Sequence, residues 1–405
     1  MAKVRPFRAL RPVPSAVSKI AAVPYDVVNT EEARALAAGN ELSFLHVSRA
    51  EIDLPADTNP YADVVYETAK ARFEAMRPHF VEEAEPALYF YRLRMGTHEQ
   101  TGLAACYSVD EYDADLVKKH EKTRRDKEDD RTRHITELRA QTGPVFLVYK
   151  ASAAIDAVAA KVMKAAPLYD LVAPDCVAHA LWKVTGDDLK AVLAGFDALP
   201  ALYIADGHHR AASAARARKA SAREAGRDGV VEADWFLAVA FPDNQTQVLP
   251  YNRIVKDLAG HTPGSFLAAV KAVFPVRDGG PASPAEKGDV AMYLGGKWYT
   301  LTISGKAGAD VISQLDVSIL QDYLLDPILK IADVRTDKRI DFVGGIRGTS
   351  ELEKLVTAGK AAVAFSMYPV SVADLMGIAD AGEIMPPKST WFEPKLRDAL
   401  LIHTI

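Results

Sequence analysis

The sequence has few of the features that mark several common classes of protein. Only two of its 405 residues are cysteines, Cys106 and Cys176. A small secreted domain held by disulfides needs more, so a reducing cytoplasm is the expected location. The sequence contains no run of about 18 apolar residues of the kind that spans a membrane. The first residues, Met1 to Pro6, lack the apolar stretch of a signal peptide.

Motifs of familiar sites are also missing. There is no His-Glu-x-x-His or Cys-x-x-Cys spacing for zinc, and no Gly-x-Ser-x-Gly turn of a serine hydrolase. His208 and His209 are neighbours, and neighbouring side chains on a helix point in different directions. At most one of them is therefore expected to bind a given metal ion. The formal net charge of -5 disfavours nonspecific binding to nucleic acid.

What the sequence does contain is enough apolar residues for sizeable cores. Hydrophobic residues make up 49% of the chain, and its length fits two or three domains. Strand-like runs alternate with helical patterns, which predicts an α/β or mixed α+β fold. We expect a core α/β domain over residues 1–259, a smaller α/β insertion or second domain over 260–335, and a C-terminal segment over 336–405 that returns to the functional site.

The individual elements are predicted from the spacing of the apolar residues. Strands are expected at Ala87–Leu93, Val145–Tyr149, Ala201–Ala205, Trp235–Phe241, Val290–Leu294, Trp298–Ile303 and Ala361–Met367. Helices are expected at Glu31–Ala38, Tyr61–Arg77, Ala153–Ala165, Asp187–Leu193, Ala211–Ala220, Pro263–Val273, Val317–Ile331 and Glu351–Thr357. The order of the strands does not follow from the sequence.

The most informative stretch is the short connection between the strand at 201–205 and the alanine-rich helix. Gly207 permits a tight turn there. The first turn of a helix presents free N–H groups and a partial positive charge, which suit a phosphate. Asp206 is either simply the N-cap of the helix or a functional member of the polar cluster at this turn. The other polar residues of this connection are His208, His209 and Arg210.

Two further segments carry candidate functional residues. Asp26 follows Pro24 in a stiff turn, where it is either an ordinary turn residue or a general base or magnesium ligand. From Lys118 to Arg133, thirteen of sixteen residues are charged, which is typical of a solvent-exposed helix. At helical spacing His120, Arg124 and Arg131 share one face, with Thr123 adjacent, and such a face suits phosphate oxygens.

The C-terminal third contains a glycine turn and a proline-rich segment. Gly344 and Gly345 either form a simple turn or allow a ligand to approach the backbone, with Arg347 close by. The segment from Met385 to Lys395 contains three prolines, which stiffen it. We favour a functional loop that presents Lys388, Ser389 and Thr390; the alternative is a packing tail.

Taken together, these motifs resemble those of a bacterial and archaeal family known as domain of unknown function 1015, over nearly the full length. The resemblance runs through Phe7–Pro12, Pro24–Val27, His120–Arg131, Asp206–Arg210, Pro250–Arg253 and Met385–Lys395. The Asp-Gly-His-His-Arg element also looks like the corresponding turn of free-serine kinases built on the ParB/sulfiredoxin-like fold. This second resemblance implies a ParB/sulfiredoxin-like nucleotide-binding core with additional α/β segments, and phosphorylation of free L-serine to O-phosphoserine with ATP or ADP and Mg²⁺.

The resemblance to the kinases also implies roles for single residues. Asp206 matches an acid that serves catalysis or magnesium, and residues 207–210 match the turn that holds phosphate. Asp26 is the first candidate for the base that deprotonates serine, and Glu121 is the second. The remaining candidates for the nucleotide site are His120, Thr123, Arg124, Arg347, Lys388 and Ser389. The expected partners are a nucleotide and a small amino acid, with a homodimer allowed and neither nucleic acid nor membrane.

Two other functions use the same candidate phosphate site. A hydrolase of a nucleotide or phosphorylated metabolite would use water in place of serine. A non-catalytic protein switched by nucleotide would bind DNA or protein, although the acidic balance of the chain argues against DNA.

Overall fold

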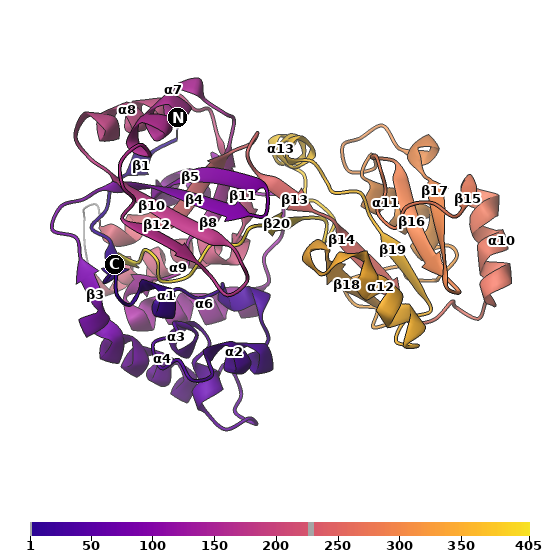
Figure 1. The fold of residues 1–405 in the computed structure, drawn as a ribbon, viewed down its shortest axis with the longest axis horizontal. Coiled ribbons are helices and arrows are strands. Elements are labelled where there is room, and N and C mark those ends of the chain that lie inside the picture. Colours follow the sequence, from indigo (N-terminus) through magenta and orange to yellow (C-terminus); the bar gives the residue numbers. More distant parts are fainter. Residues whose placement is uncertain (1, 226–230) are drawn as a thin grey trace. The chain divides into compact units, whose positions relative to one another are not determined.

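A computed structural model describes residues 2–225 and 231–405 and divides the chain into two compact units (Figure 1). The first unit consists of Met1–Thr246 and Pro394–Ile405, and the second of Gln247–Glu393. Both units contain a sheet and helices, so the predicted mixed α/β class is confirmed. None of the described helices is long and apolar enough to cross a membrane.

The first unit is built on a nine-stranded mixed sheet. The pairs β11–β6 and β12–β8 are parallel and the other pairs are antiparallel. In sheet order the strands are β6 (Val117–Lys118), β11 (Leu202–Asp206), β8 (Val145–Tyr149), β12 (Trp235–Pro242), β5 (His98–Ser108), β4 (Leu88–Met95), β10 (Ala178–Val184) and β9 (Tyr169–Val172), with β1 (Val4–Arg5) paired to β5.

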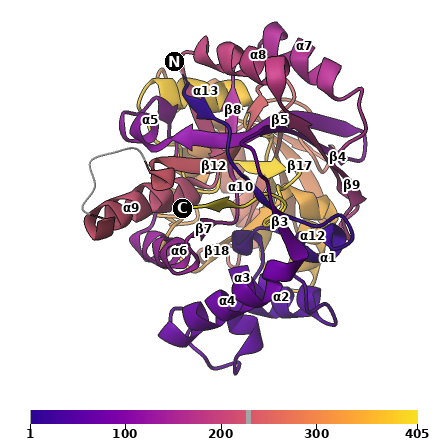
Figure 2. The same cartoon turned by 90° about the vertical axis from the view of Figure 1, so that its left-hand side faces the viewer.

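Helices cover both faces of this sheet, as Figures 1 and 2 show. One face carries α7 (Ala153–Val162) and α8 (Gly186–Asp197), and the other carries α6 (Arg125–Leu138) and α9 (His208–Ala225). A strand covered on both faces needs an apolar side chain at every position. All five residues of β8 are accordingly buried.

A helical layer formed by the N-terminal residues packs against α6. Its buried core includes Phe44 and Phe73, and the C-terminal residues Ala399 and Ile402 are part of the same core. The layer contains α1 (Val17–Ile20), η1 (Tyr25–Val27), α2 (Thr30–Ala37), α3 (Leu45–Ser48), η2 (Ala50–Asp53), α4 (Asp63–Met76) and η3 (Arg77–His79). The smaller elements of the first unit are β2 (Leu10–Pro12), β3 (Phe80–Glu82), α5 (Val109–Asp113), β7 (Ala140–Gln141), η4 (Glu232–Asp234) and β21 (His403–Thr404).

The second unit has a six-stranded antiparallel sheet. In sheet order its strands are β15 (Val276–Asp278), β17 (Lys297–Thr302), β16 (Asp289–Leu294), β19 (Val363–Ser366), β14 (Tyr251–Val255) and β18 (Ile340–Gly344). Its other elements are β13 (Gln247–Leu249), α10 (Pro263–Val273), η5 (Ser304–Lys306), α11 (Asp316–Leu320), the π-helix η6 (Gln321–Leu325), η7 (Gly345–Arg347), α12 (Gly348–Thr357), α13 (Val372–Asp380) and β20 (Trp391–Glu393).

The structure divides the chain at other points than the predicted boundaries of 259/260 and 335/336. The reason is strand pairing: β14 from the predicted core pairs with β18 and β19, and β19 also pairs with β16 of the predicted insertion. One sheet therefore joins parts of all three predicted segments. Of the predicted C-terminal segment, only Pro394–Ile405 belongs to the first unit.

Two predicted helices differ from the observed elements. The charged stretch from Lys118 is not helical before Arg125, because Lys118 ends β6 and pairs with Tyr203 of β11. His120 and Arg124 therefore do not share a helical face with Arg131. The expected helix at 317–331 contains only the short α11 and the π-helix η6.

Candidate active site

The turn between β11 and α9 has a backbone that requires glycine. Gly207 has a φ of +92°, and a Cβ added to it would lie 2.9 Å from Nε of Arg210. The carbonyl of Gly207 accepts a 3.0 Å hydrogen bond from the amide of Ala211, as the carbonyl of an N-cap residue does. Since α9 begins at His208, Gly207 holds the capping position. Of the two interpretations of Asp206, the N-cap is therefore not the one that the structure shows.

Asp206 ends β11 with its carboxylate close to two cations. Nζ of Lys395 donates a 3.0 Å hydrogen bond to Oδ2 of Asp206, and Nη2 of Arg210 lies 3.7 Å from the same oxygen. Burial raises the pKa of the Asp206 carboxyl, but Lys395 and Arg210 together lower it more, so this pKa lies well below its usual range. Asp206 is therefore a carboxylate at neutral pH.

Arg210 brings Asp26 to the same place. Nη2 of Arg210 lies 3.6 Å from Oδ2 of Asp26, so a single guanidinium nitrogen faces both carboxylates. The Nη1 atom of Arg210 donates a hydrogen bond to the carbonyl of Pro144, which fixes the orientation of the guanidinium group. Asp26 is the second residue of η1, which begins directly after Pro24, as the proline-stiffened turn predicts. The two acids that were candidates for magnesium or base chemistry thus share one arginine.

The segment that joins β6 to α6 crosses the start of α9 and is held by two imidazole rings. The amide of His120 donates to Nε2 of His208 at 3.5 Å, and the amide of Arg124 donates to Nε2 of His209 at 3.0 Å. Burial lowers the pKa of both histidines of α9. Both are therefore neutral at physiological pH, and the ring of His209 contributes no positive charge.

Two other candidates in this segment have local partners. The hydroxyl of Thr123 donates to Oε1 of Glu128 in the first turn of α6. The exposed guanidinium of Arg124 forms hydrogen bonds of 3.1 and 2.7 Å with the carboxylate of Asp126.

Glu121, the second candidate for the base, lies with Oε2 3.7 Å from Nδ1 of His208. The structure thus brings His120, Glu121 and Arg124 to the turn, but through contacts that the helical interpretation did not predict.

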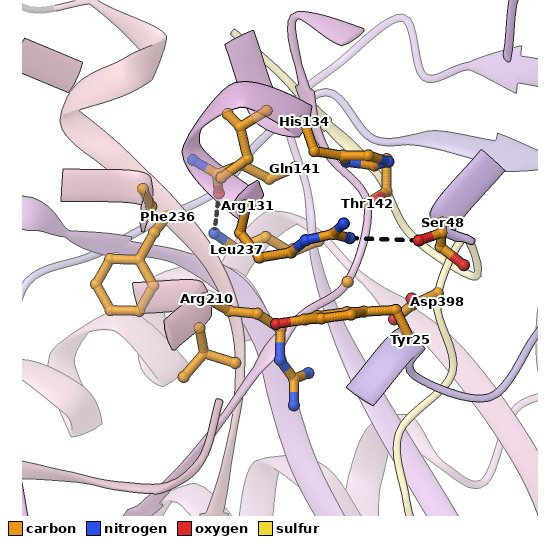
Figure 3. Close-up of a pocket in the computed structure, with 14 residues that line it drawn as sticks. Tyr25, Ser48, Arg131, His134, Gln141, Thr142, Arg210, Phe236, Leu237 and Asp398 are labelled. Carbon is orange, nitrogen blue, oxygen red and sulfur yellow. Dashed lines mark hydrogen bonds between the residues drawn. The ribbon is translucent and has the colours of Figure 1, made fainter. Parts of the chain in front are cut away.

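A small cavity of about 40 Å³ adjoins the arginine that joins the two acids (Figure 3). The guanidinium carbon of Arg131 lies 4.1 Å from the centre of the Tyr25 ring in this cavity, which is a cation–π contact. Asp398 also lines it, and burial raises the pKa of this carboxyl to about 7, although Arg210 acts in the opposite direction. The volume holds a few water-sized molecules but no metabolite.

A second cavity, of about 190 Å³, shares Tyr25 and Arg131 with the first in its lining. Its walls include two acid–base pairs. Nε of Arg49 lies 3.0 Å from Oε1 of Glu51, and Nη2 of Arg131 lies 2.9 Å from Oδ2 of Asp130. This volume is below that of a typical drug-sized pocket, so it fits a small polar metabolite.

Three predicted site residues belong to the second unit. Ser389 is buried and its hydroxyl donates a 2.6 Å hydrogen bond to the carbonyl of Pro386. Nζ of Lys388 lies 5.3 Å from the centre of the Tyr251 ring. Arg347 ends η7. The part of Arg347, Lys388 and Ser389 in an anion site remains a prediction.

The glycine pair of the second unit serves packing. A Cβ on Gly344 would lie 2.9 Å from the ring of Trp391, and a Cβ on Gly345 would lie 2.6 Å from the carbonyl of Pro250. The sequence allows either a simple turn or the close approach of a ligand to the backbone of these glycines. The groups that approach their backbone in the structure are protein groups. Trp391 comes from the proline-rich segment, so its contact with Gly344 anchors that segment within the second unit.

Sequence reasoning did not assign two residues that the structure places at the turn. Lys395 closes the proline-rich segment and was identified only as part of that motif, although a basic residue at the end of a stiffened loop is a usable signal. Asp398 has no such signal, because nothing in its sequence neighbourhood shows that it is buried beside Arg210.

The chain was compared with curated proteins and with solved structures. No curated protein matches the chain. A conserved hypothetical protein from Pyrococcus furiosus is 16% identical, with 74% of this chain and 94% of that chain covered and a TM-score of 0.35. A free serine kinase in complex with AMP is 14% identical, with 73% and 92% covered and a TM-score of 0.34. The corresponding values for SbnI from Staphylococcus aureus are 12%, 73%, 87% and 0.36.

The family is established by a match of a different kind. The model of the family described as protein of unknown function DUF1015 matches residues 4–318. This range covers most of the chain and includes the turn at residues 206–210. The resemblance found in the sequence motifs is therefore confirmed, and the chain belongs to the DUF1015 family.

Proposed function

We propose that the first unit is a phosphotransferase that moves the terminal phosphoryl group of ATP or ADP to the hydroxyl of free L-serine, giving O-phosphoserine. The observation that carries this proposal is the position of Nη2 of Arg210, 3.6 Å from Asp26 and 3.7 Å from Asp206, at the start of α9. Two acids held by one arginine beside a helix N-terminus supply both a base and a phosphate-binding surface.

Phosphoryl transfer asks for alignment and charge neutralisation rather than covalent catalysis by the protein. The free amides of the first turn of α9 suit the phosphates of the nucleotide. Arg210 is positioned to stabilise charge on the transferred group. Asp26 and Asp206, which lie beside Nη2 of Arg210, keep its guanidinium group in place.

Asp26 is the proposed base. Its side chain is about one-third exposed, so a hydroxyl from solvent or substrate can reach it. In the proposed step, Asp26 accepts the proton of the serine hydroxyl while the serine oxygen forms a bond to the phosphorus atom. The bond from phosphorus to the bridging oxygen of the nucleotide breaks, and the nucleotide leaves with that oxygen and one phosphate fewer.

The donor set at the turn suits magnesium. Mg²⁺ is commonly held by one or two carboxylates together with phosphate oxygens, and Asp206 and Asp26 supply two carboxylates near one another. Asp206 stays ionised because its pKa lies far below neutral, although it must share its Oδ2 atom with Lys395. Magnesium bound there would neutralise charge on the phosphates.

The cavity of about 190 Å³ is the proposed site of the amino-acid acceptor. An amino acid carries an ammonium and a carboxylate, and the walls offer acids such as Glu51 and Asp130 and cations such as Arg49 and Arg131. Tyr25 lines this cavity and precedes Asp26 in the chain. This supports an acceptor that approaches the base from the helical layer.

The test is an acceptor panel. The protein is incubated with Mg²⁺, ATP or ADP, and each of serine, threonine, homoserine and water alone, and the products are identified by phosphorus NMR. We expect O-phosphoserine to form and little inorganic phosphate to appear without acceptor. Phosphate release at the same rate without any acceptor would identify a hydrolase, and no product with any donor and acceptor would refute the kinase proposal.

A further inference from the structure

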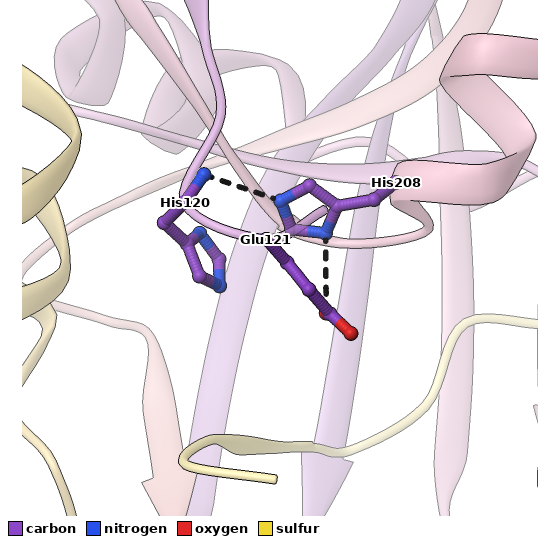
Figure 4. Close-up of side chains that lie close together, drawn as sticks. All are labelled: His120, Glu121 and His208. Carbon is purple, nitrogen blue, oxygen red and sulfur yellow. Dashed lines mark hydrogen bonds and ion pairs between the residues drawn. The ribbon is translucent and has the colours of Figure 1, made fainter. Parts of the chain in front are cut away.

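Three side chains next to the turn form a group of the kind that binds metal ions (Figure 4). His120, Glu121 and His208 each offer one nitrogen or carboxylate oxygen, and these atoms lie within 4.8 Å of one another. In the part of the chain that the structure describes, no other group of three or more His, Cys, Asp or Glu side chains meets this spacing. Ligand atoms of a tetrahedral zinc ion lie about 3.4 Å apart, so the three side chains must approach one another by up to about 1.4 Å.

The separation of Glu121 from His208 fits two ligands better than a hydrogen bond. Nδ1 of His208 lies 3.7 Å from Oε2 of Glu121, which is too far for a hydrogen bond between nitrogen and oxygen. The same distance is close to the spacing of two ligands of one ion. Figure 4 marks this contact between the carboxylate of Glu121 and the ring of His208 with a dashed line.

His120 supplies a buried nitrogen with no partner. Its side chain is 2% exposed, and its Nδ1 atom has no hydrogen-bond partner. A buried ring nitrogen without a hydrogen-bond partner is available as a metal ligand.

The ring of His208 has one competing contact. Its Nε2 atom accepts from the amide of His120 at 3.5 Å, at the outer limit of hydrogen-bond length. Binding of an ion through Nδ1 moves the ring proton to Nε2 and gives up this contact. The contact is long, so its loss costs little compared with a bond to a metal ion.

The surroundings favour metal binding as well. The two rings stand nearly perpendicular at 87°, with 4.5 Å between their centres. Glu121 is half exposed, so an ion can enter from solvent.

We propose that Nδ1 of His120, Nδ1 of His208 and the carboxylate of Glu121 bind one transition-metal dication, with Zn²⁺ as the best match. Two imidazoles and one carboxylate form a known zinc ligand set that leaves a fourth position open for water or a substrate oxygen. Imidazole selects zinc and its neighbours over magnesium. This site differs from the proposed magnesium position at Asp206, and the proposal does not depend on the kinase activity.

The experiment is a titration of full-length protein, free of any histidine tag and of nucleotide. Zn²⁺ binding is followed by calorimetry, and Co²⁺ binding by its visible absorption, which reports low coordination number. We expect one tight site per chain. Glu121→Gln should weaken Zn²⁺ binding at least about tenfold and His120→Asn at least about 100-fold, and excess Mg²⁺ should not displace Co²⁺.

His46→Asn is the matched control. His46 is buried, and its Nδ1 atom forms a 2.7 Å hydrogen bond with Oδ1 of Asp53. It is therefore a histidine–carboxylate pair joined by a hydrogen bond, in contrast to His208 and Glu121. This variant should bind Zn²⁺ as the wild type does, and circular dichroism checks that each variant is folded. Wild-type protein that binds no Zn²⁺, equal affinity of the wild type and Glu121→Gln, or displacement of Co²⁺ by Mg²⁺ would overturn the proposal.

Discussion

At the scale of single residues, the candidate site depends on one glycine. The φ of +92° at Gly207 and the 2.9 Å approach of Arg210 leave no room for a Cβ atom. The sequence predicts the need for glycine in a tight turn. It does not predict that the space is filled by the guanidinium that joins Asp26 and Asp206, because that contact depends on the conformation of a long side chain.

Gly207→Ala should destabilise the protein and displace Arg210. An alanine in the left-handed region costs about 1 to 2 kcal/mol, and the clash with Arg210 adds to this cost. The free energy of unfolding is measured by chemical denaturation. Gly39→Ala is the control, because Gly39 has a φ of +73° but nothing within 4 Å of its Cβ position. Equal losses in the two variants would contradict the proposed packing.

Asp398 should make stability depend on pH. Its pKa is about 7 in the folded protein and about 3.9 in an unfolded chain. Between these values the folded state holds a proton that the unfolded state has lost, so stability falls as the pH rises from about 4 to about 7. The stability that the protonated carboxyl of Asp398 contributes is fully present below about pH 4.

Asp398→Asn removes this titration. Asparagine resembles the protonated acid, so the variant keeps its stability where the wild type loses some. The Tm of the variant should therefore increase relative to that of the wild type from pH 4 to pH 8. Thermal unfolding of both proteins over this range measures it. A constant difference would show that Asp398 is not protonated in the folded protein near neutral pH.

At the scale of elements, the sequence predicts local periodicity well and pairing poorly. β8 and α10 are found at their predicted bounds, because a fully apolar run and an amphipathic run that begins with proline are local signals. The contact of Lys395 with Asp206 joins residues 189 positions apart, and that of His120 with His208 joins residues 88 apart. No local pattern encodes such contacts.

The alanines of α9 show what the alanine-rich pattern means. Ala211, Ala214 and Ala215 are buried in the core cluster of the large sheet, and small side chains let the helix approach the sheet closely. The helix then holds the first-turn residues His208 and Arg210 at the end of β11. The composition of this helix therefore positions the site.

Ala211→Leu should push α9 away from the sheet. Overpacking of a well-packed core costs about 1 to 3 kcal/mol, measured by denaturant unfolding, and the displaced helix should weaken nucleotide binding in the same preparation. Ala220→Leu lies further along α9 at a half-buried position and should cost less than about 0.5 kcal/mol. Equal effects at both positions would contradict this account of α9.

At the scale of the whole molecule, the first unit is assembled from both ends of the chain. Leu396, Leu400 and Leu401 are buried, and β21 pairs with β7. Lys395 comes from the same C-terminal segment. The sequence predicts a returning C-terminal segment, but its observed extent is only residues 394–405.

Removal of the second unit should leave the first unit folded. Gln247 pairs with Glu393 in β13 and β20, so the chain leaves and returns at neighbouring points about 5 Å apart. A protein with residues 247–393 replaced by two glycines should unfold cooperatively on heating. Deletion of residues 394–405 from the full chain should abolish this transition in the first unit. Aggregation of the first protein, or full stability of the second, would contradict the two-unit description.

The turn at residues 206–210 is the proposed phosphoryl-transfer site. The most direct measurement uses nucleotide labelled in its terminal phosphate, free serine and Mg²⁺, and compares the wild type with Asp206→Asn. We expect labelled O-phosphoserine from the wild type and at least about 100-fold less from a folded Asp206→Asn variant. Equal transfer by the two proteins, or no labelled phosphoserine from the wild type, would contradict it.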